Sequence, residues 1–140
     1  EAWWDTKDWQ RLTDFEVAYW VDGPGQPTDR VDPAIRALVS DWISTNYRAE
    51  KVEGIPQVLD PPADARLGDL RVPLLVIVGE LDDESTTASM RHLAERVPGT
   101  RLETFPTAHL VNLEQPQRFN EVLGSFLDAA SSSELASERE

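Results

Sequence analysis

Cysteine is absent from this chain of 140 residues. Without a thiol there is no disulfide framework, no thiolate metal site and no cysteine nucleophile, and the redox state of the compartment is left open. Long apolar runs are absent too. The longest, Val72 to Val78, is interrupted by Pro73 and is too short to cross a bilayer. These absences exclude a cysteine nucleophile and a thiolate metal site in this chain, and they leave no run long enough to span a bilayer.

Positive charge is scarce. The chain has 13 lysine and arginine residues against 26 aspartate and glutamate residues, a net charge of −13, and no run rich in lysine or arginine. Such a field repels nucleic acid and anionic lipid, so we expect neither nucleic acid nor membrane as a partner. No segment resembles a signal peptide, which makes a cytoplasmic location the default expectation. The chain begins at Glu1 rather than methionine, which is compatible with a missing upstream segment.

Two halves of different character meet near residue 65, where paired prolines and small residues in LDPPADARLGDLRVP interrupt any regular pattern. In residues 1–65, large apolar residues recur at helical spacing up to the breaker DGPGQP. A second helix is predicted after Asp32 as N-cap, with Pro33 in its first turn and an apolar stripe on one face. The first half is therefore predicted to be helical, and its tryptophans supply material for a core.

The second half, residues 66–130, alternates strands and helices. VPLLVIVGELDD predicts a strand buried on both faces, and TRLETF predicts another. A helix from about Ser85 separates them, and a terminal helix is predicted from Pro116. Residues 131–140 lack an apolar stripe and are predicted to be a disordered tail. The order β, α, β, α is a right-handed crossover of the α/β class.

Two parallel strands are too few for a sheet domain, because each buried strand needs neighbours and an unpaired edge invites association. Residues 66–130 are therefore interpreted as the edge of a larger sheet, whose other strands come from elsewhere.

Acidic and imidazole side chains follow the two predicted strands at their carboxyl ends, where parallel sheets gather binding and catalytic groups. Asp82 follows the first strand, and His109 follows the second within FPTAH. Adjacent parallel strands would place the two loops side by side, which lets a carboxylate hold one imidazole tautomer. Each residue alone has an ordinary alternative, a turn or helix cap for the acid and a structural loop residue for the histidine. The other histidine, His92, lies in a predicted helix and is interpreted as a surface residue.

LRVPLLVIVGELDD, the helix after it and PGTRLETFPTAHLVNLEQPQRFNEVLGSFL resemble the carboxyl-terminal half of an α/β-hydrolase over residues 69–128. The resemblance implies that Asp82 is the triad acid, with Asp83 as the alternative, and that His109 is the base. Ala108 stands where the family usually has glycine. Glu114 also fits the family pattern, with a structural role in bonding loop backbone. Residues 1–65 resemble the helical cap, so the expected fold is a partial α/β-hydrolase: edge strands of a parallel sheet with flanking helices and a cap segment.

The nucleophile of such an enzyme is missing. Family members attack with a serine on a G-x-S-x-G elbow upstream of the cap, and this chain has no such motif. The resemblance thus implies a hydrolase that is inactive as this chain alone and needs the amino-terminal portion of the same hydrolase as its partner. The expected substrate is a small apolar ester, lactone or related carbonyl compound. Aromatic residues of the cap are candidates for its pocket, or alternatively for the core of the cap: Trp3, Trp4, Trp9, Tyr19 and Trp20.

A non-enzymatic binding or dimerisation module with the hydrolase shape is the alternative function. Exposed sheet edges and the aromatic cap would then form a protein interface, including that of a homodimer. A metal site is disfavoured, because the two histidines lack H-x-x-x-H spacing and Asp82, Asp83 and Glu84 lack the spacing of a calcium loop. We therefore expect no metal and no cofactor.

Overall fold

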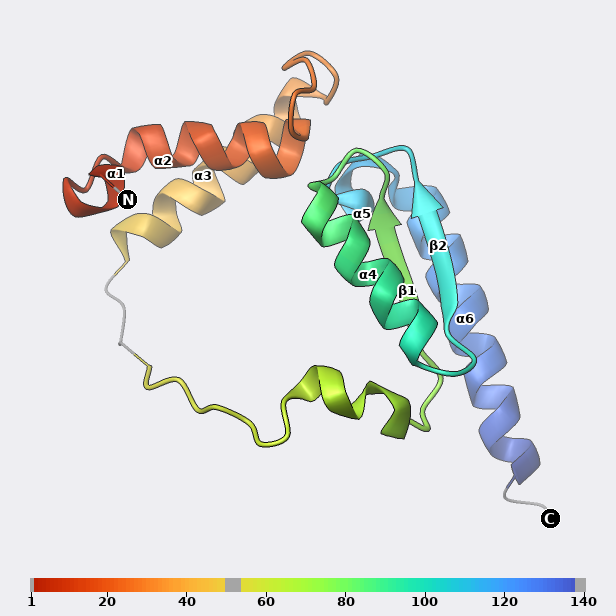
Figure 1. Cartoon of the computed structure of the whole chain (residues 1–140). Coiled ribbons are helices and arrows are strands. Elements are labelled where there is room, and N and C mark those ends of the chain that lie inside the picture. The colour runs from red at the N-terminus through yellow and green to blue at the C-terminus, as the bar shows by residue number, and fades with distance from the viewer. Residues whose placement is uncertain (1, 50–53, 138–140) are drawn as a thin grey trace.

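The structure, a computed structural model, describes residues 2–49 and 54–137. A helical group and a strand–helix group follow one another along the chain and are joined by a long connection (Figure 1). The elements in order are α1 (Ala2–Asp5), α2 (Trp9–Glu16), the π-helix η1 (Val17–Asp22), α3 (Pro33–Arg48), the 3-10 helix η2 (Ala63–Asp69), β1 (Leu75–Gly79), α4 (Glu84–Arg96), β2 (Arg101–Phe105), α5 (Val111–Glu114) and α6 (Pro116–Ser137).

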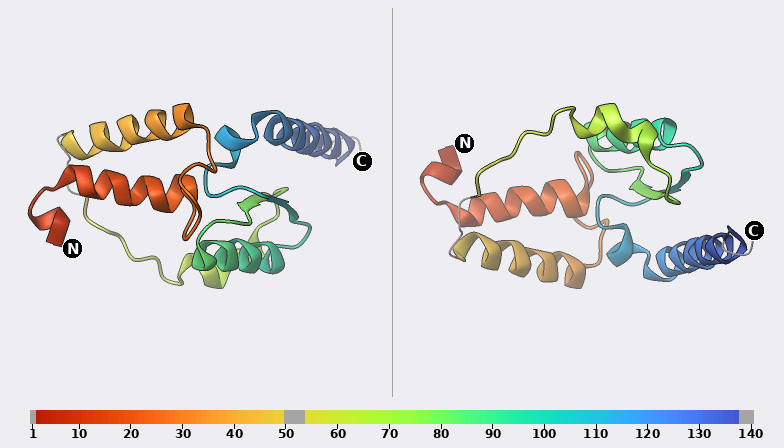
Figure 2. Two further views of the ribbon diagram at one scale, coloured as in Figure 1. Left: turned by 90° about the horizontal axis from the view of Figure 1, so that it is seen from above. Right: turned by 90° about the horizontal axis from the view of Figure 1, so that it is seen from below.

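The helical group is built on two long antiparallel segments that lie side by side, α2 with its continuation η1, and α3 (Figures 1 and 2). Their core is made of four buried valines: Val17, Val21, Val31 and Val39. Two leucines from the segment after β2, Leu110 and Leu113, pack against this core. The helical group therefore shares its core with the segment that follows β2.

Three helices begin after an aspartate side chain that accepts a backbone N–H: α2 after Asp8, α3 after Asp32 and α4 after Asp83. Each carboxylate satisfies a donor that has no partner within its helix. The predicted N-cap Asp32 is confirmed, and α4 begins at Glu84, one residue before the predicted start.

β1 and β2 form a two-stranded parallel sheet with α4 as the crossover, in agreement with the predicted order of elements. Leu75 pairs with Arg101 and Gly79 with Phe105, so the two strands end at the same level. α4 and α6 lie on opposite sides of this sheet (Figure 2). The loops that follow β1 and β2 consequently start side by side.

Two glycines allow three loops to meet at this end of the sheet. A Cβ on Gly79 would lie 2.1 Å from the carbonyl oxygen of Ala108. Gly23, directly after η1, has a φ of 94°, and a Cβ there would lie 2.6 Å from the carbonyl oxygen of Leu81. Because a side chain at either position would push the backbones apart, glycine is required at both. The end of η1 thereby contacts the loop after β1, which contacts the loop after β2.

Three features differ from the sequence predictions. η2 occupies Ala63–Asp69 and contacts α4, where an irregular boundary is predicted near residue 65. The six residues of η1 form a π-helix, which no pattern in the sequence indicates.

The tail prediction needs correction, because α6 continues to Ser137 and residues 131–137 are helical. Their alanine, serine, leucine and glutamate include no helix breaker. Residues 138–140 lie outside the described residues, and the division into cap and core stays a prediction.

Large apolar side chains are exposed in the connection between the two groups. Ile55, Val58 and Leu59 are all exposed there, and no residue from 54 to 62 is assigned to a helix or strand. Within the described residues, no helix is long and apolar enough to cross a membrane.

Candidate functional site

Asp82 and His109 meet at the carboxyl end of the sheet. The Nδ1 atom of His109 lies 2.7 Å from Oδ2 of Asp82, within hydrogen-bond distance. The Asp82 side chain is 3% exposed, whereas that of His109 is 45% exposed. The contact expected from two adjacent parallel strands is therefore present, with a buried carboxylate behind an accessible imidazole. With Nδ1 bound to the carboxylate, Nε2 is the nitrogen available to another molecule.

Backbone hydrogen bonds join the loop that carries Asp82 to the loop that carries His109. The N–H of Glu80 donates to the carbonyl of Phe105 at 2.8 Å, and the N–H of Leu81 donates to that of Thr107 at 2.9 Å. The second carboxylate oxygen of Asp82, Oδ1, accepts the N–H of Asp83 at 2.8 Å. The carboxylate is thus held by its own loop through one oxygen and faces the imidazole with the other.

Asp83, the alternative acid, is engaged elsewhere. Its carboxylate caps α4 by accepting the N–H of Ser85 at 3.0 Å, and it also accepts the Ser85 hydroxyl. Hydrogen bonds from Ser85, and then from Tyr19, lower the pKa of Asp83 from 3.8 to about 2. The hydrogen bond to Asp83 in turn raises the pKa of Tyr19. Asp82 is therefore the acid that contacts His109, and Asp83 is the N-cap of α4.

Ala108 fits the position where the family resemblance implies glycine. The residue is fully buried, and its Cβ lies next to Gly23 at the end of η1. Its carbonyl oxygen lies where any side chain on Gly79 would have to be. A methyl group is accommodated because the two neighbouring backbones already carry glycine at the points of closest approach.

Glu114 bonds the backbone of the histidine loop, which agrees with its predicted structural role. Its Oε1 accepts the N–H of Ala108 at 2.9 Å. The same carboxylate forms an ion pair with Arg30, which lies between η1 and α3. Sequence reasoning missed Arg30, and the only signal available was a single basic residue in an acidic turn region, TDRVD.

One row of aromatic rings leads from the helical group to the imidazole. The Trp20 ring lies 4.8 Å from that of His109, and the carbonyl oxygen of Trp20 accepts the N–H of His109 at 3.2 Å. Tyr19 contacts Trp20, Phe15 contacts Tyr19, and Trp3 contacts Phe15, at centroid distances of 4.7, 5.7 and 6.3 Å. Three predicted pocket residues, Trp3, Tyr19 and Trp20, therefore lie in a continuous row that ends at His109. Phe15 completes it and was not selected from the sequence.

The other two predicted pocket residues belong to a second aromatic group. Trp9 stacks on Tyr47 of α3 at 5.4 Å, and Trp4 contacts both rings at 5.5 and 5.9 Å. Burial and a hydrogen bond to Glu16 raise the pKa of Tyr47 to about 12. These rings join α1, α2 and α3, and Trp4 is 51% exposed, so Trp4 and Trp9 lie apart from the row that ends at His109 and hold helices of the first half together.

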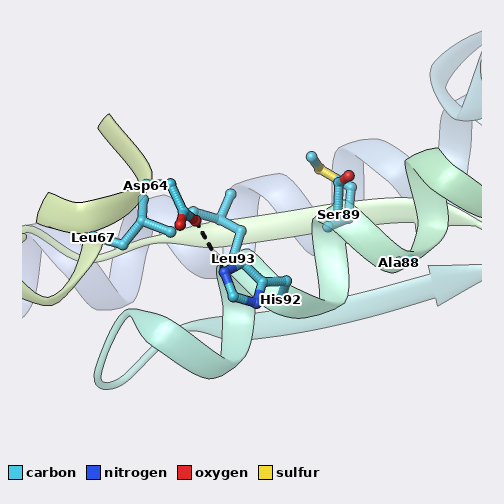
Figure 3. A pocket seen from close by; sticks show the side chains of 7 residues that line it. Asp64, Leu67, Ala88, Ser89, His92 and Leu93 are labelled. Carbon is cyan, nitrogen blue, oxygen red and sulfur yellow. Dashed lines mark hydrogen bonds and ion pairs between the residues drawn. The ribbon is translucent and has the colours of Figure 1, made fainter. Parts of the chain in front are cut away.

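His92 lies on the surface, as predicted. Its Nε2 is 2.9 Å from Oδ1 of Asp64, beside a hollow of about 530 Å³ between η2 and α4 (Figure 3). Both side chains are exposed, at 52% and 71%. Within residues 2–49 and 54–137, no group of three or more histidine, aspartate or glutamate side chains is arranged to hold a metal ion.

No protein-family profile matches the chain. Among curated proteins, it is 30% identical over 116 residues to a putative 2-succinyl-6-hydroxy-2,4-cyclohexadiene-1-carboxylate synthase of Bacillus subtilis, an alignment that covers 79% of this chain and 42% of the relative. It is 38% identical over 86 residues to 3-oxoadipate enol-lactonase 2 of Acinetobacter baylyi, covering 59% of this chain and 32% of the relative. The chain thus spans less than half the length of these relatives.

Solved structures show which fold the chain shares. The enol-lactonase of Burkholderia xenovorans matches with a TM-score of 0.65 and 22% identity, over 91% of this chain and 48% of that one. Est816, an N-acyl homoserine lactone degrading enzyme, matches with a TM-score of 0.62 and 23% identity, over 89% of this chain and 49% of that one. The relatives in sequence and structure are α/β-hydrolases, and this chain has a partial α/β-hydrolase fold.

Proposed function

We propose that this chain is the part of a serine-dependent hydrolase that supplies the acid and the general base. The contact between His109 Nδ1 and a buried oxygen of Asp82, at 2.7 Å, carries the proposal. It occurs where adjacent parallel strands end, the usual location of catalytic groups in such sheets. The relatives named above include enol-lactonases, which supports hydrolysis as the reaction class.

The proposed chemistry uses both nitrogens of the imidazole. Asp82 keeps the proton on Nδ1, so Nε2 accepts the proton of a serine hydroxyl as that oxygen attacks the substrate carbonyl. The carboxylate then stabilises the resulting imidazolium, which returns its proton to the leaving group. Water hydrolyses the acyl-enzyme in a second cycle of the same transfers.

The serine is proposed to come from a companion polypeptide, the amino-terminal portion of the hydrolase. β1 is paired on one edge only within the described part of the chain. Val76 and Val78 make it an apolar strand, and an open apolar edge favours pairing with a further strand. The relatives are about twice as long as their match to this chain, which leaves room for the remaining strands and the nucleophile.

The proposed substrate is a small apolar ester or lactone. The row formed by Trp3, Phe15, Tyr19 and Trp20 ends at His109 and offers apolar and aromatic surface to the non-reacting part of such a molecule. Trp3 and Phe15 are 40% and 52% exposed, so this surface is accessible.

Turnover by the native assembly tests the proposal. The chain is purified together with the proteins that bind it, and the intact masses are measured. Hydrolysis of p-nitrophenyl acetate is then assayed before and after reaction with a fluorophosphonate, which labels an activated serine. We expect a second polypeptide that carries the label, and turnover that His109→Ala removes while His92→Ala leaves it unchanged. A single 15.7 kDa species without turnover contradicts the proposal.

A non-enzymatic interaction module is the second candidate, favoured by the exposed apolar side chains of Ile55, Val58 and Val72. Exposed apolar surface marks a protein interface where it forms one contiguous patch. The two candidates differ in one respect: a binding module assembles equally well with His109→Ala and has no turnover to lose. Sedimentation of the variant together with the turnover assay separates them.

A further inference from the structure

A half-buried guanidinium connects the helical group to the segment after the histidine loop. Arg30 donates from Nε to the carbonyl oxygen of Asp22 and from Nη2 to that of Val21, both at 2.8 Å. Its two Nη atoms also face the two carboxylate oxygens of Glu114. One side chain therefore links the last turn of η1 to the end of α5, 84 residues further along the chain.

Glu114 extends this link to the backbone beside His109. Its Oε1 accepts the N–H of Ala108, and the next N–H, that of His109 itself, donates to the carbonyl of Trp20. Two consecutive amides of the histidine loop are thus bound to the same turn of η1. One is bound directly, and the other is bound through Glu114 and Arg30.

We propose that Arg30 is a positioning residue for His109. By holding the histidine loop against η1 through Glu114, it keeps Nδ1 of the imidazole on the Asp82 carboxylate. This inference rests on the proposed role of His109 as general base and adds that the helical group sets the orientation of that base. Arg30 acts through Glu114 and the backbone and makes no contact of its own with the reacting atoms.

The chemistry of the site calls for arginine in particular. A planar guanidinium can serve two carboxylate oxygens and two carbonyl oxygens at once, whereas the single ammonium of lysine cannot span all four in one plane. The side chains of Arg30 and Glu114 are 17% and 9% exposed, so water replaces these hydrogen bonds poorly. Removing either partner leaves the other charged, half-buried and without its counter-ion.

A simpler role for Arg30 is capping the carboxyl end of η1. A cation is stabilised at such an end, and the two carbonyls there need donors. Capping alone reaches the histidine loop only through the hydrogen bond from His109 to the Trp20 carbonyl, and it leaves the bond between Ala108 and Glu114 unchanged. If Arg30 positions the histidine loop, its substitution also changes the Ala108 amide and the His109 ring. The test therefore reads out the histidine loop directly, in the full 140-residue chain labelled with ¹⁵N.

Two NMR observables measure the histidine loop: the hydrogen-exchange rates of the Ala108 and His109 amides, and the tautomer of the His109 ring from long-range ¹H–¹⁵N correlations. With Arg30→Gln we expect both amides to exchange about tenfold faster or more, because their anchor is lost. The population of the Nδ1–H tautomer of His109 should fall. The ring of His92 provides an unaffected reference in the same spectrum.

Arg36→Gln is the matched control. Arg36 forms an ion pair with Asp22 at 2.7 Å, adjacent to the Arg30 site but entirely within the helical group. We expect this variant to alter amides of α3 and η1 while leaving the His109 tautomer as in the parent. Glu114→Gln keeps an acceptor for Ala108 but turns amide hydrogens toward Arg30, so it should reproduce the tautomer change.

The outcome that overturns the proposal is an Arg30→Gln chain with faster exchange in η1 but parental exchange and tautomer at His109. If Arg30→Gln loses the dispersed amide spectrum of a folded protein, Arg30→Lys decides by the same readouts. That variant retains the charge beside Glu114, and we expect an intermediate change, whereas an unchanged histidine loop would again reject positioning. No turnover enters these measurements, so failure of the proposed hydrolase and failure of the positioning role are distinguishable.

Discussion

Two histidine–aspartate pairs occur in the described part of the chain, and the distances between their facing atoms are nearly equal. His109 lies 2.7 Å from Asp82, and His92 lies 2.9 Å from Asp64. The two imidazoles are also similarly accessible, at 45% and 52%. The carboxylates differ: that of Asp82 is 3% exposed and that of Asp64 is 71% exposed. Neither the distance nor the access to the histidine separates the two pairs, whereas burial of the acid does.

Burial of the carboxylate changes what the pair can do. Water competes with an exposed carboxylate, so the pair at His92 constrains its imidazole weakly, like other surface ion pairs (Figure 3). The carboxylate of Asp82 is shielded, and the backbone of His109 is bound by Trp20 next to an anchored Ala108. The contacts around the His109 imidazole therefore constrain its orientation more than those around His92 do, as the proposed general-base role requires.

Removing each imidazole in turn gives the largest contrast between the pairs. In the assembled hydrolase we expect His109→Ala to lower kcat by about six orders of magnitude, as loss of a triad base does. His92→Ala should stay within about twofold, because a surface substitution far from the reaction changes little. The steady-state rate of p-nitrophenyl acetate hydrolysis, taken after any initial burst, gives kcat for both variants. Equal losses in the two variants would mean that His109 has no special role.

Neutralising the two acids is the next contrast. Asp82→Asn should lower kcat by about four orders of magnitude, because an amide stabilises the wrong tautomer and cannot stabilise the imidazolium. Asp64→Asn should leave kcat unchanged. The comparison uses the same assay over a range of pH, and a near-parental Asp82→Asn enzyme would assign the acid to another residue.

Replacing the aromatic ring that contacts His109 should lower kcat moderately. Trp20→Leu removes the aromatic surface 4.8 Å from the imidazole but keeps the backbone carbonyl that binds His109. We expect kcat to fall about tenfold, the size of effect that follows from slightly less favourable orientation. Trp9→Leu, in the group around Tyr47, is the control. It should cost about 1 kcal/mol of stability through the lost stacking and leave kcat unaffected. Similar kcat values for the two variants would show that the aromatic row does not support the site.

The smallest effect on turnover is expected at Asp83, the neighbour of Asp82. Asp83→Ala removes the N-cap of α4 and should lower the urea midpoint at neutral pH while kcat changes little. The pKa of Asp83 is lowered to about 2, so its stabilisation is present above its usual value of 3.8 and is lost as pH falls through about 2. The difference between parent and variant midpoints should therefore shrink below pH 4. A difference that persists to pH 2 would contradict this assignment.

The sequence predicted the site where regular backbone geometry fixes it. Two short strands joined by a helix favour parallel pairing, and parallel pairing puts the loop that carries Asp82 beside the loop that carries His109. The cap at Asp32 and the start of α4 follow equally from local rules. These predictions depend on neighbours within a few residues or on the handedness of one crossover.

Contacts between distant segments could not be predicted in this way. Arg30 meets Glu114 across 84 residues, and only the assembled loops bring them together. The predicted pocket aromatics divide into two groups: Tyr19 and Trp20 of η1 lie toward His109, whereas Trp9 of α2 stacks on Tyr47 of α3, and this division depends on how α3 packs. The helical stretch after residue 131 was missed for another reason: absence of an apolar stripe argues against burial, not against a helix.

The π-helix η1 gives this segment an unusual sensitivity to length. A π turn closes its hydrogen bonds over one residue more than an α turn, and Val17–Asp22 are all in this form. Deleting one residue before Tyr19 would shift the later residues of the turn by one position, so another residue would stand where the Trp20 ring contacts the imidazole. The ring would then leave the imidazole although the composition of the segment had hardly changed. Over evolutionary time, insertions and deletions in this one turn are therefore a greater hazard to the site than most substitutions in it.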